Sequence, residues 1–157
     1  MNSLGLYPKY LLGKGIKNDK IGVIGHSMGT GIACDFCSRH KISFTILINP
    51  FSKAADMAKN IAQKLDMPEF VKTMIETIPS FLIPLKNVFN NEKAIKKIKS
   101  PILILHNTND ETIPVKHGQK LYKQNQKKIY YKEFKDNDHE INKEKIDFCL
   151  NFIEKIA

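Results

Sequence analysis

The feature that most constrains how this chain can fold is a short apolar run that leads straight into a glycine-flanked turn. Ile21–Ile24 has the composition of a buried strand, and a helical pattern runs from about Met28 to His40. Between them lies Gly25-His26-Ser27-Met28-Gly29. The two glycines are the positions where such a turn needs no side chain, so that the Ser27 hydroxyl can stand above the end of the strand. Strand, turn and helix in this order predict an α/β sheet with a nucleophile at its carboxyl edge.

Three more strand patterns alternate with helices along the rest of the chain. Strands are expected at Ser43–Ile48, Pro101–His106 and Lys128–Phe134. Helices are expected from about Val115 to Gln124 and from about Lys143 to Ile156. In the last helix, four large aliphatic residues share one face: Ile146, Leu150, Ile153 and Ile156. Apolar strands that alternate with helices predict a mainly parallel sheet covered on both faces, a three-layer α/β core in a single domain over residues 1–157.

The connection between the second and third strands, residues 50–98, is of a different kind. Phe51 to Leu65 and Glu69 to Ile78 have helical patterns, whereas the two prolines in Pro79–Leu85 rule out a regular helix there. Large apolar residues are frequent: Phe70, Met74, Ile75, Ile78, Phe81, Leu82, Ile83 and Phe89. Two interpretations remain open, a crossover packed on the sheet and a cap over an apolar pocket. We predict a helical, cap-like insertion.

The charge of the chain is strongly positive but diffuse. The formal net charge is +9, and Arg39 is the only arginine among the cations. Nucleic-acid readers rely on the bidentate contacts of arginine, so no nucleic-acid partner is expected. A solvated lysine-rich surface is the simplest interpretation, and peripheral contact with an anionic membrane stays open.

The cysteines and the apolar runs bear on the compartment. Cys34, Cys37 and Cys149 do not make a disulfide framework, which suits a reducing compartment. The pair Cys34-x-x-Cys37 lies on a predicted helix without a second pair, so packing is favoured over zinc or redox chemistry. Neither an apolar run of about 18 residues nor a signal-peptide pattern at Met1–Tyr10 is seen. The expected location is cytoplasmic, with membrane association at most peripheral.

An acid and a base follow later strands. A serine hydroxyl is a weak nucleophile until a base removes its proton. Asp110 lies in the loop after Pro101–His106, and His139 lies in the loop after Lys128–Phe134. Loops after parallel strands meet at one edge of the sheet, so Ser27, Asp110 and His139 are predicted to converge there. The Met28 amide, at the helix N-terminus, is a candidate oxyanion donor, and His26 is expected to support the turn or the pocket.

With these residues in place, the stretch from about Asp19 to Ile156 resembles the C-terminal half of the α/β-hydrolase superfamily. Gly25–Gly29 and Pro101–Pro114 are similar to the monoglyceride-lipase, serine-aminopeptidase-like and BEM46-like branches. The resemblance implies hydrolysis of esters, thioesters or occasionally amides, without metal or cofactor. Ser27 would be acylated, His139 would carry the proton, and Asp110 would orient the imidazole. The apolar insertion favours acyl-chain or lipid-like substrates.

The chain also departs from that family. Family members have roughly four strands before the nucleophile strand, and one of the loops between them gives a second oxyanion amide, whereas only about twenty residues precede Ile21 here. We therefore expect a core without those strands, from a fragment, a truncated gene product or a chain completed by a partner. The strand Ile21–Ile24 would then be an exposed apolar edge, open to self-association.

Two other functions remain open at this point. One is a catalytically impaired hydrolase homologue that serves as a binding module. The other is an NAD(P)-dependent short-chain dehydrogenase, with Gly25-x-x-x-Gly29-x-Gly31 as the nucleotide fingerprint and Tyr131 and Lys135 as the catalytic pair. Against the dehydrogenase, Tyr131 lies in a strand pattern, and Asn49 stands near the position of the expected ribose-binding acid.

Overall fold

The fold is built on one parallel sheet. The computed structural model describes residues 10–11, 13–57, 89–135 and 139–156, and all structural statements concern these residues. Four strands form the sheet in the order β1-β2-β3-β4: β1 Gly22–His26, β2 Phe44–Ile48, β3 Ile102–Asn107 and β4 Ile129–Phe134. Every neighbouring pair is parallel. The predicted parallel sheet is confirmed.

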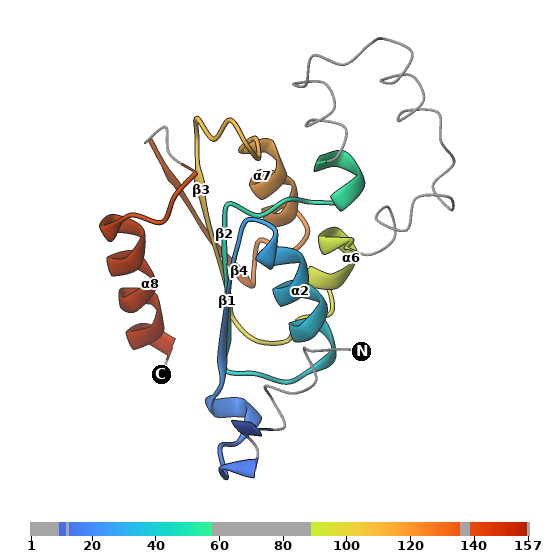
Figure 1. The fold of residues 1–157 in the computed structure, drawn as a ribbon, viewed down its shortest axis with the longest axis vertical. Coiled ribbons are helices and arrows are strands. Elements are labelled where there is room, and N and C mark those ends of the chain that lie inside the picture. Colours follow the sequence, from blue (N-terminus) through green and yellow to red (C-terminus); the bar gives the residue numbers. More distant parts are fainter. Residues whose placement is uncertain (1–9, 12, 58–88, 136–138, 157) are drawn as a thin grey trace.

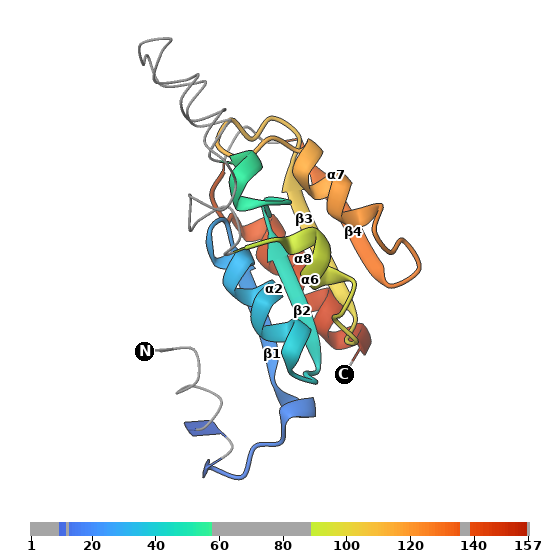
Figure 2. The same ribbon diagram turned by 90° about the vertical axis from the view of Figure 1, so that its right-hand side faces the viewer.

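Helices cover both faces of this sheet, as Figures 1 and 2 show. On one face lie α2 (Gly29–Arg39), α6 (Asn91–Ile95) and α7 (Lys116–Tyr122). On the other face lies α8 (Lys143–Ile156). A short 3-10 turn, η2 (Asn18–Lys20), precedes β1 along the chain. The three-layer α/β architecture is therefore confirmed. None of the described helices is long and apolar enough to cross a bilayer.

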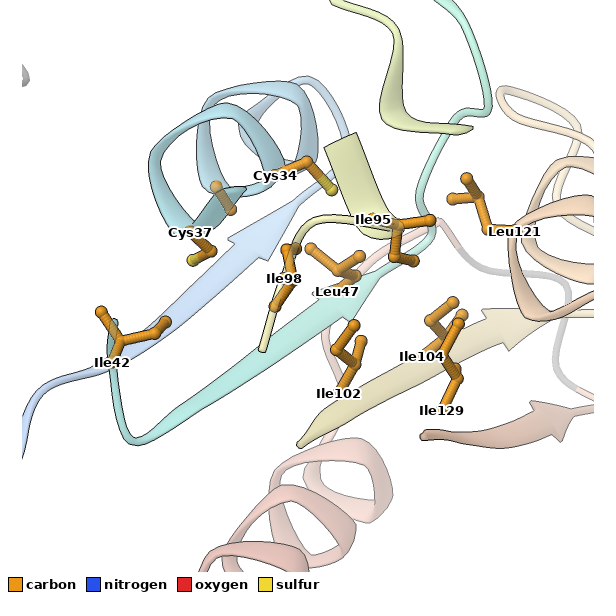
Figure 3. Close-up of a cluster of buried hydrophobic side chains, with 11 residues drawn as sticks. Cys34, Cys37, Ile42, Leu47, Ile95, Ile98, Ile102, Ile104, Leu121 and Ile129 are labelled. Carbon is orange, nitrogen blue, oxygen red and sulfur yellow. The ribbon is translucent and has the colours of Figure 1, made fainter. Parts of the chain in front are cut away.

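The larger core cluster lies between the sheet and the first helical layer (Figure 3). Its buried members are mostly aliphatic and come from α2, α6, α7, the strands and the connections that lead into β2 and β3: Ala33, Cys34, Cys37, Ile42, Leu47, Ile95, Ile98, Ile102, Ile104, Leu121 and Ile129. Burial raises the pKa of the Cys37 thiol to about 11 and also raises the pKa of Cys34 and Cys149. These cysteines are packed as small apolar side chains, and no group of metal-binding residues occurs among the described residues.

The second core cluster lies under α8, and its composition corrects one expectation. Cys149 and Phe152 are buried in it, and Ile153 and Ile156 pack against its rim. Ile146 and Leu150, however, are 48% and 53% exposed, so only part of the predicted face contacts the sheet. The helix carries two apolar stripes, and its register against the sheet decides which of them is buried.

The two edge strands differ in how they are protected. On β4, Lys132 and the exposed Tyr130 mark the outer strand, and a lysine there disfavours pairing with another chain. On β1 no charged side chain is present, and Ile24 is 55% exposed. An apolar groove of about 460 Å³ runs between β1 and α2, and Ile32 and Phe36 of α2 line it.

The segment between β2 and β3 is described only at its two ends. Lys53 and Asn90 form an antiparallel bridge, and the Asn90 side chain caps α6 by accepting from the Lys93 amide at 3.0 Å. Ile95 and Ile98 then return to the main core. Most of the predicted insertion, residues 58–88, lies outside the described residues, so the cap-like insertion stays a prediction.

Candidate functional site

Ser27 stands on the sharp turn between β1 and α2. Its φ of 52° lies in the left-handed region, which costs a non-glycine residue about 1–3 kcal/mol. Hydrogen bonds hold this conformation: the Ser27 amide donates to the Ile48 carbonyl at 3.0 Å, and the Thr30 amide and hydroxyl donate to the Ser27 carbonyl at 3.0 and 2.6 Å. The strained turn lifts the hydroxyl above the carboxyl edge of the sheet.

The two glycines of the turn are not equivalent. A Cβ on Gly25 would lie 2.8 Å from both the Ala33 Cβ and the Gly29 carbonyl oxygen, so β1 and α2 can approach only if position 25 has no side chain. A Cβ on Gly29 would meet no described atom within 4 Å. The close approach of β1 and α2 thus accounts for the glycine at position 25, whereas no described atom lies close enough to require a glycine at position 29.

Asp110 lies in the loop beyond β3, and hydrogen bonds from main-chain amides of the same loop fix its carboxylate. Its Oδ1 accepts hydrogen bonds from the amides of Thr112 and Ile113, both at 2.8 Å. Its side chain is fully buried. Two amides on one oxygen fix the direction of the carboxylate and leave Oδ2 to face another partner.

His139 joins this carboxylate to the serine. Its Nδ1 lies 2.6 Å from Asp110 Oδ2, and its Nε2 lies 2.8 Å from Ser27 Oγ. The imidazole is 20% exposed, so it is reachable from solvent. An Nδ1–H that donates to the carboxylate leaves Nε2 as the acceptor for the serine proton. The structure thus brings together Ser27, Asp110 and His139 from three separate loops, in the geometry that activates a serine nucleophile.

A second histidine, His106, supports the acid loop. It is fully buried at the end of β3, and its Nε2 donates to the Ile113 carbonyl at 2.8 Å. Burial lowers the pKa of His106, which favours a neutral ring under the turn that carries Asp110. The ring packs against Gly118, where a Cβ would lie 2.4 Å from its Nδ1. The sequence shows His106 only as a strand residue, and nothing in its spacing indicates this role.

The backbone of His139 is held by two further residues. Its carbonyl accepts a hydrogen bond from Asn49 Nδ2 at 2.7 Å and another from His26 Nε2 at 2.9 Å. His26 was expected to support the turn or the pocket, and it lies at the end of β1 with its ring 5.1 Å from that of His139. Asn49 was not predicted at this site. Its sequence signal is an asparagine directly after a strand, a position where asparagine tolerates left-handed backbone.

Met28, the candidate oxyanion donor, starts the turn into α2. Its amide donates to no group among the described residues, and it lies at the N-terminus of an 11-residue helix. This placement suits an amide that stabilises negative charge next to Ser27. The Met28 side chain is 55% exposed, so an apolar surface lies beside the serine.

The arrangement around Tyr131 does not suit a dehydrogenase. Tyr131 lies in β4, and its hydroxyl donates to Glu133 Oε1 at 2.7 Å. Burial raises the pKa of this phenol, and the adjacent carboxylate of Glu133 raises it further. A tyrosine that serves as a proton donor and acceptor in catalysis needs a pKa near the working pH. The predicted pair with Lys135 is therefore not supported.

Comparison with known proteins identifies the family to which the chain belongs. A family model described as phospholipase/carboxylesterase matches residues 42–157, more than half of the chain. The chain belongs to this family of α/β-hydrolases. The matched region holds Asp110 and His139, and Ser27 precedes it.

Individual relatives are distant and longer than this chain. Human protein ABHD12B is 29% identical over 106 residues, which cover 62% of this chain and 28% of that protein. The lysophosphatidylserine lipase ABHD12 of Macaca fascicularis is 29% identical over 113 residues, which cover 67% of this chain and 27% of that protein. An acetyl xylan esterase from Paenibacillus sp. R4 is similar in structure, with a TM-score of 0.75 at 15% identity, and the match covers 97% of this chain and 50% of that one. The chain thus spans less than a third of the length of the two curated relatives. At 15% identity, the similarity to the esterase structure concerns the fold alone.

Proposed function

We propose that this phospholipase/carboxylesterase family member hydrolyses carboxylic esters or thioesters through an acyl-Ser27 intermediate. One observation carries the proposal: the His139 ring lies within hydrogen-bonding distance of both Ser27 Oγ, at 2.8 Å, and Asp110 Oδ2, at 2.6 Å. Each of these side chains comes from a different loop at the carboxyl edge of the sheet.

The chemistry proceeds in two halves. As Ser27 Oγ attacks the acyl carbon, His139 Nε2 takes the hydroxyl proton, and the Met28 amide donates to the oxyanion. Asp110 stabilises the imidazolium that forms. His139 then gives its proton to the leaving alkoxide or thiolate, and the acyl group remains on Ser27. In the second half a water molecule attacks the acyl carbon as it loses a proton to His139. The bond between the acyl carbon and Ser27 Oγ then breaks, His139 returns the proton to Ser27 Oγ, and the carboxylic acid is released.

The substrate class proposed is an acyl ester with an apolar acyl group. The exposed Met28 side chain next to Ser27 offers an apolar contact for such a group. The description of the matched family and the name of the lysophosphatidylserine lipase, which apply to those proteins, favour the same class. If each added methylene is buried, kcat/KM should rise by up to about fourfold per methylene along a series of p-nitrophenyl esters.

The test is covalent labelling with a fluorophosphonate probe, read by mass spectrometry. We expect one adduct on Ser27 in the wild type and none in Ser27→Ala, together with ester hydrolysis that Ser27→Ala lacks. A folded wild type that is neither labelled nor faster than Ser27→Ala would contradict the proposal. That outcome would favour the binding-module alternative.

A further inference from the structure

Two donors from different strands converge on the backbone carbonyl of His139. Asn49 lies directly after β2 and donates from Nδ2 at 2.7 Å, and His26 lies at the end of β1 and donates from Nε2 at 2.9 Å. We infer that Asn49, with His26 as a second donor, is a positioning residue that fixes the main chain of His139. The inference rests on the proposed function, since it assigns a role within that reaction.

Asn49 is itself held in one orientation. It is fully buried, and its φ is 48°. Its main-chain amide donates to the Leu105 carbonyl at 2.8 Å. Its Oδ1 accepts from the Asn107 amide at 3.2 Å. One side-chain partner is therefore a main-chain donor and the other a main-chain acceptor, which leaves a single assignment of the amide oxygen and nitrogen. The side chain ties β3 to the loop that carries His139.

The need for such a tie follows from where His139 lies. It belongs to the connection between β4 and α8, and its ring must meet Asp110 and Ser27 at the same time. Hydrogen bonds to the ring alone do not fix the backbone that carries it. With the carbonyl held as well, the ring needs only its own two torsions to reach both partners. A displacement of about 1 Å in such a group can lower a rate by about a hundredfold.

Asn49→Asp removes the proposed contact with little change in shape. Aspartate tolerates the left-handed backbone as asparagine does, and its Oδ1 can still accept from the Asn107 amide. The donor toward His139 is replaced by an oxygen that faces a carbonyl oxygen. A matched control is Asn91→Asp: Asn91 is also buried, and its Nδ2 donates to the Phe51 carbonyl at 2.8 Å, outside the site.

The first measurement is the rate of fluorophosphonate labelling, separated into the maximal rate and the half-saturating concentration. We expect Asn49→Asp to lower the maximal rate by about tenfold to a hundredfold with little change in half-saturation. Asn91→Asp should lose stability and keep the wild-type rate. At position 26, His26→Gln keeps a hydrogen-bond donor and should retain most of the maximal labelling rate. His26→Phe removes the donor and should label more slowly.

A second measurement does not depend on reactivity. The His139 Nδ1 proton, shared with a carboxylate oxygen at 2.6 Å, should give a downfield imidazole resonance in the proton NMR spectrum. We expect it to broaden or vanish in Asn49→Asp and to persist in Asn91→Asp. If the wild type is unlabelled but the resonance behaves in this way, the proposed hydrolysis is wrong and the positioning role stands. If Asn49→Asp keeps the resonance, or labels within about twofold of the wild type, the positioning role is refuted.

Discussion

Gly25→Ala and Gly29→Ala add the same methyl group to one turn, and the structure predicts different effects on stability and labelling for the two substitutions. At Gly25 the new Cβ would lie 2.8 Å from the Ala33 Cβ, 2.8 Å from the Gly29 carbonyl oxygen and 3.0 Å from the Thr30 Cα. None of these atoms is the flexible end of a side chain. Since carbon atoms approach to about 3.5 Å at best, α2 must move from β1 by roughly 0.7 Å.

The magnitude of the loss at Gly25 follows from this overlap. Overpacking of a rigid interior costs about 1–3 kcal/mol, and a chain of 157 residues loses about 2–4 °C of Tm per kcal/mol. Gly25→Ala should therefore lower Tm by roughly 2–12 °C. Because α2 begins two residues after Ser27, the same movement disturbs the 2.8 Å contact with His139, and labelling should slow by about tenfold or more.

At Gly29, near the start of α2, the methyl group would meet no described atom within 4 Å. Its φ is not positive, so alanine fits the backbone, and alanine is a better helix former than glycine by up to about 1 kcal/mol. Gly29→Ala should keep the wild-type Tm or raise it by up to about 4 °C, and it should label at close to the wild-type rate.

The assay combines thermal unfolding by circular dichroism with fluorophosphonate labelling of the folded proteins. The informative quantity is the difference between the two variants, because both change the composition of the chain equally. Equal losses in Gly25→Ala and Gly29→Ala would refute the reasoning, since they would mean that the motif requires glycine at both positions for a reason other than the contact between β1 and α2.

Three further predictions concern groups outside this turn. Because all three thiols are buried, Ellman's reagent should react with none of them in the folded protein and with all three after denaturation. Burial lowers the pKa of His106 below 6.5, so the unfolded chain binds more protons than the folded one once the pH falls through that value. The free energy of unfolding, measured by urea titration, should therefore decrease from about pH 7 to about pH 5.5, and less steeply in His106→Asn. We also propose self-association through the outer edge of β1, which pairs with no described strand other than β2: Ile32→Glu, which places a charge in its apolar groove, should lower the mass measured by sedimentation, and Tyr130→Glu on β4 should leave it unchanged.

Most of the sheet could be predicted from the sequence because its central strands are apolar on both faces. In β2 and β3 every residue except Phe44 is buried, so a short continuous apolar run was a sufficient signal. The observed strand limits differ from the predicted ones by at most two residues. The face of α8 could not be predicted in the same way. Lys145 is fully buried while Leu150 is half exposed, an outcome that depends on where the helix lies and not on residue type.

The candidate site was predictable to the extent that it follows from topology. The order of Ser27, Asp110 and His139 after successive strands placed them at one edge, and the structure brings them into contact. The sequence shows Asn49 only as an asparagine directly after a strand, and its partner could not be predicted, because that partner is a main-chain carbonyl 90 residues away. A hydrogen bond to a carbonyl leaves no requirement on the identity of the residue that carries it.

The four parallel strands explain why one array can contain all these groups. Each strand delivers one residue at its carboxyl end: Ser27 after β1, Asn49 after β2, Asp110 after β3 and His139 after β4. The hydrogen bonds between these residues therefore also join the ends of the strands to one another. The central pair β2 and β3 is the most buried part of the sheet, and it leads into Asn49 and Asp110, which contact the carbonyl and the ring of His139. The edge strand β1 leads into Ser27, so a disturbance of that edge should change the position of Ser27 before it changes the contact between His139 and Asp110.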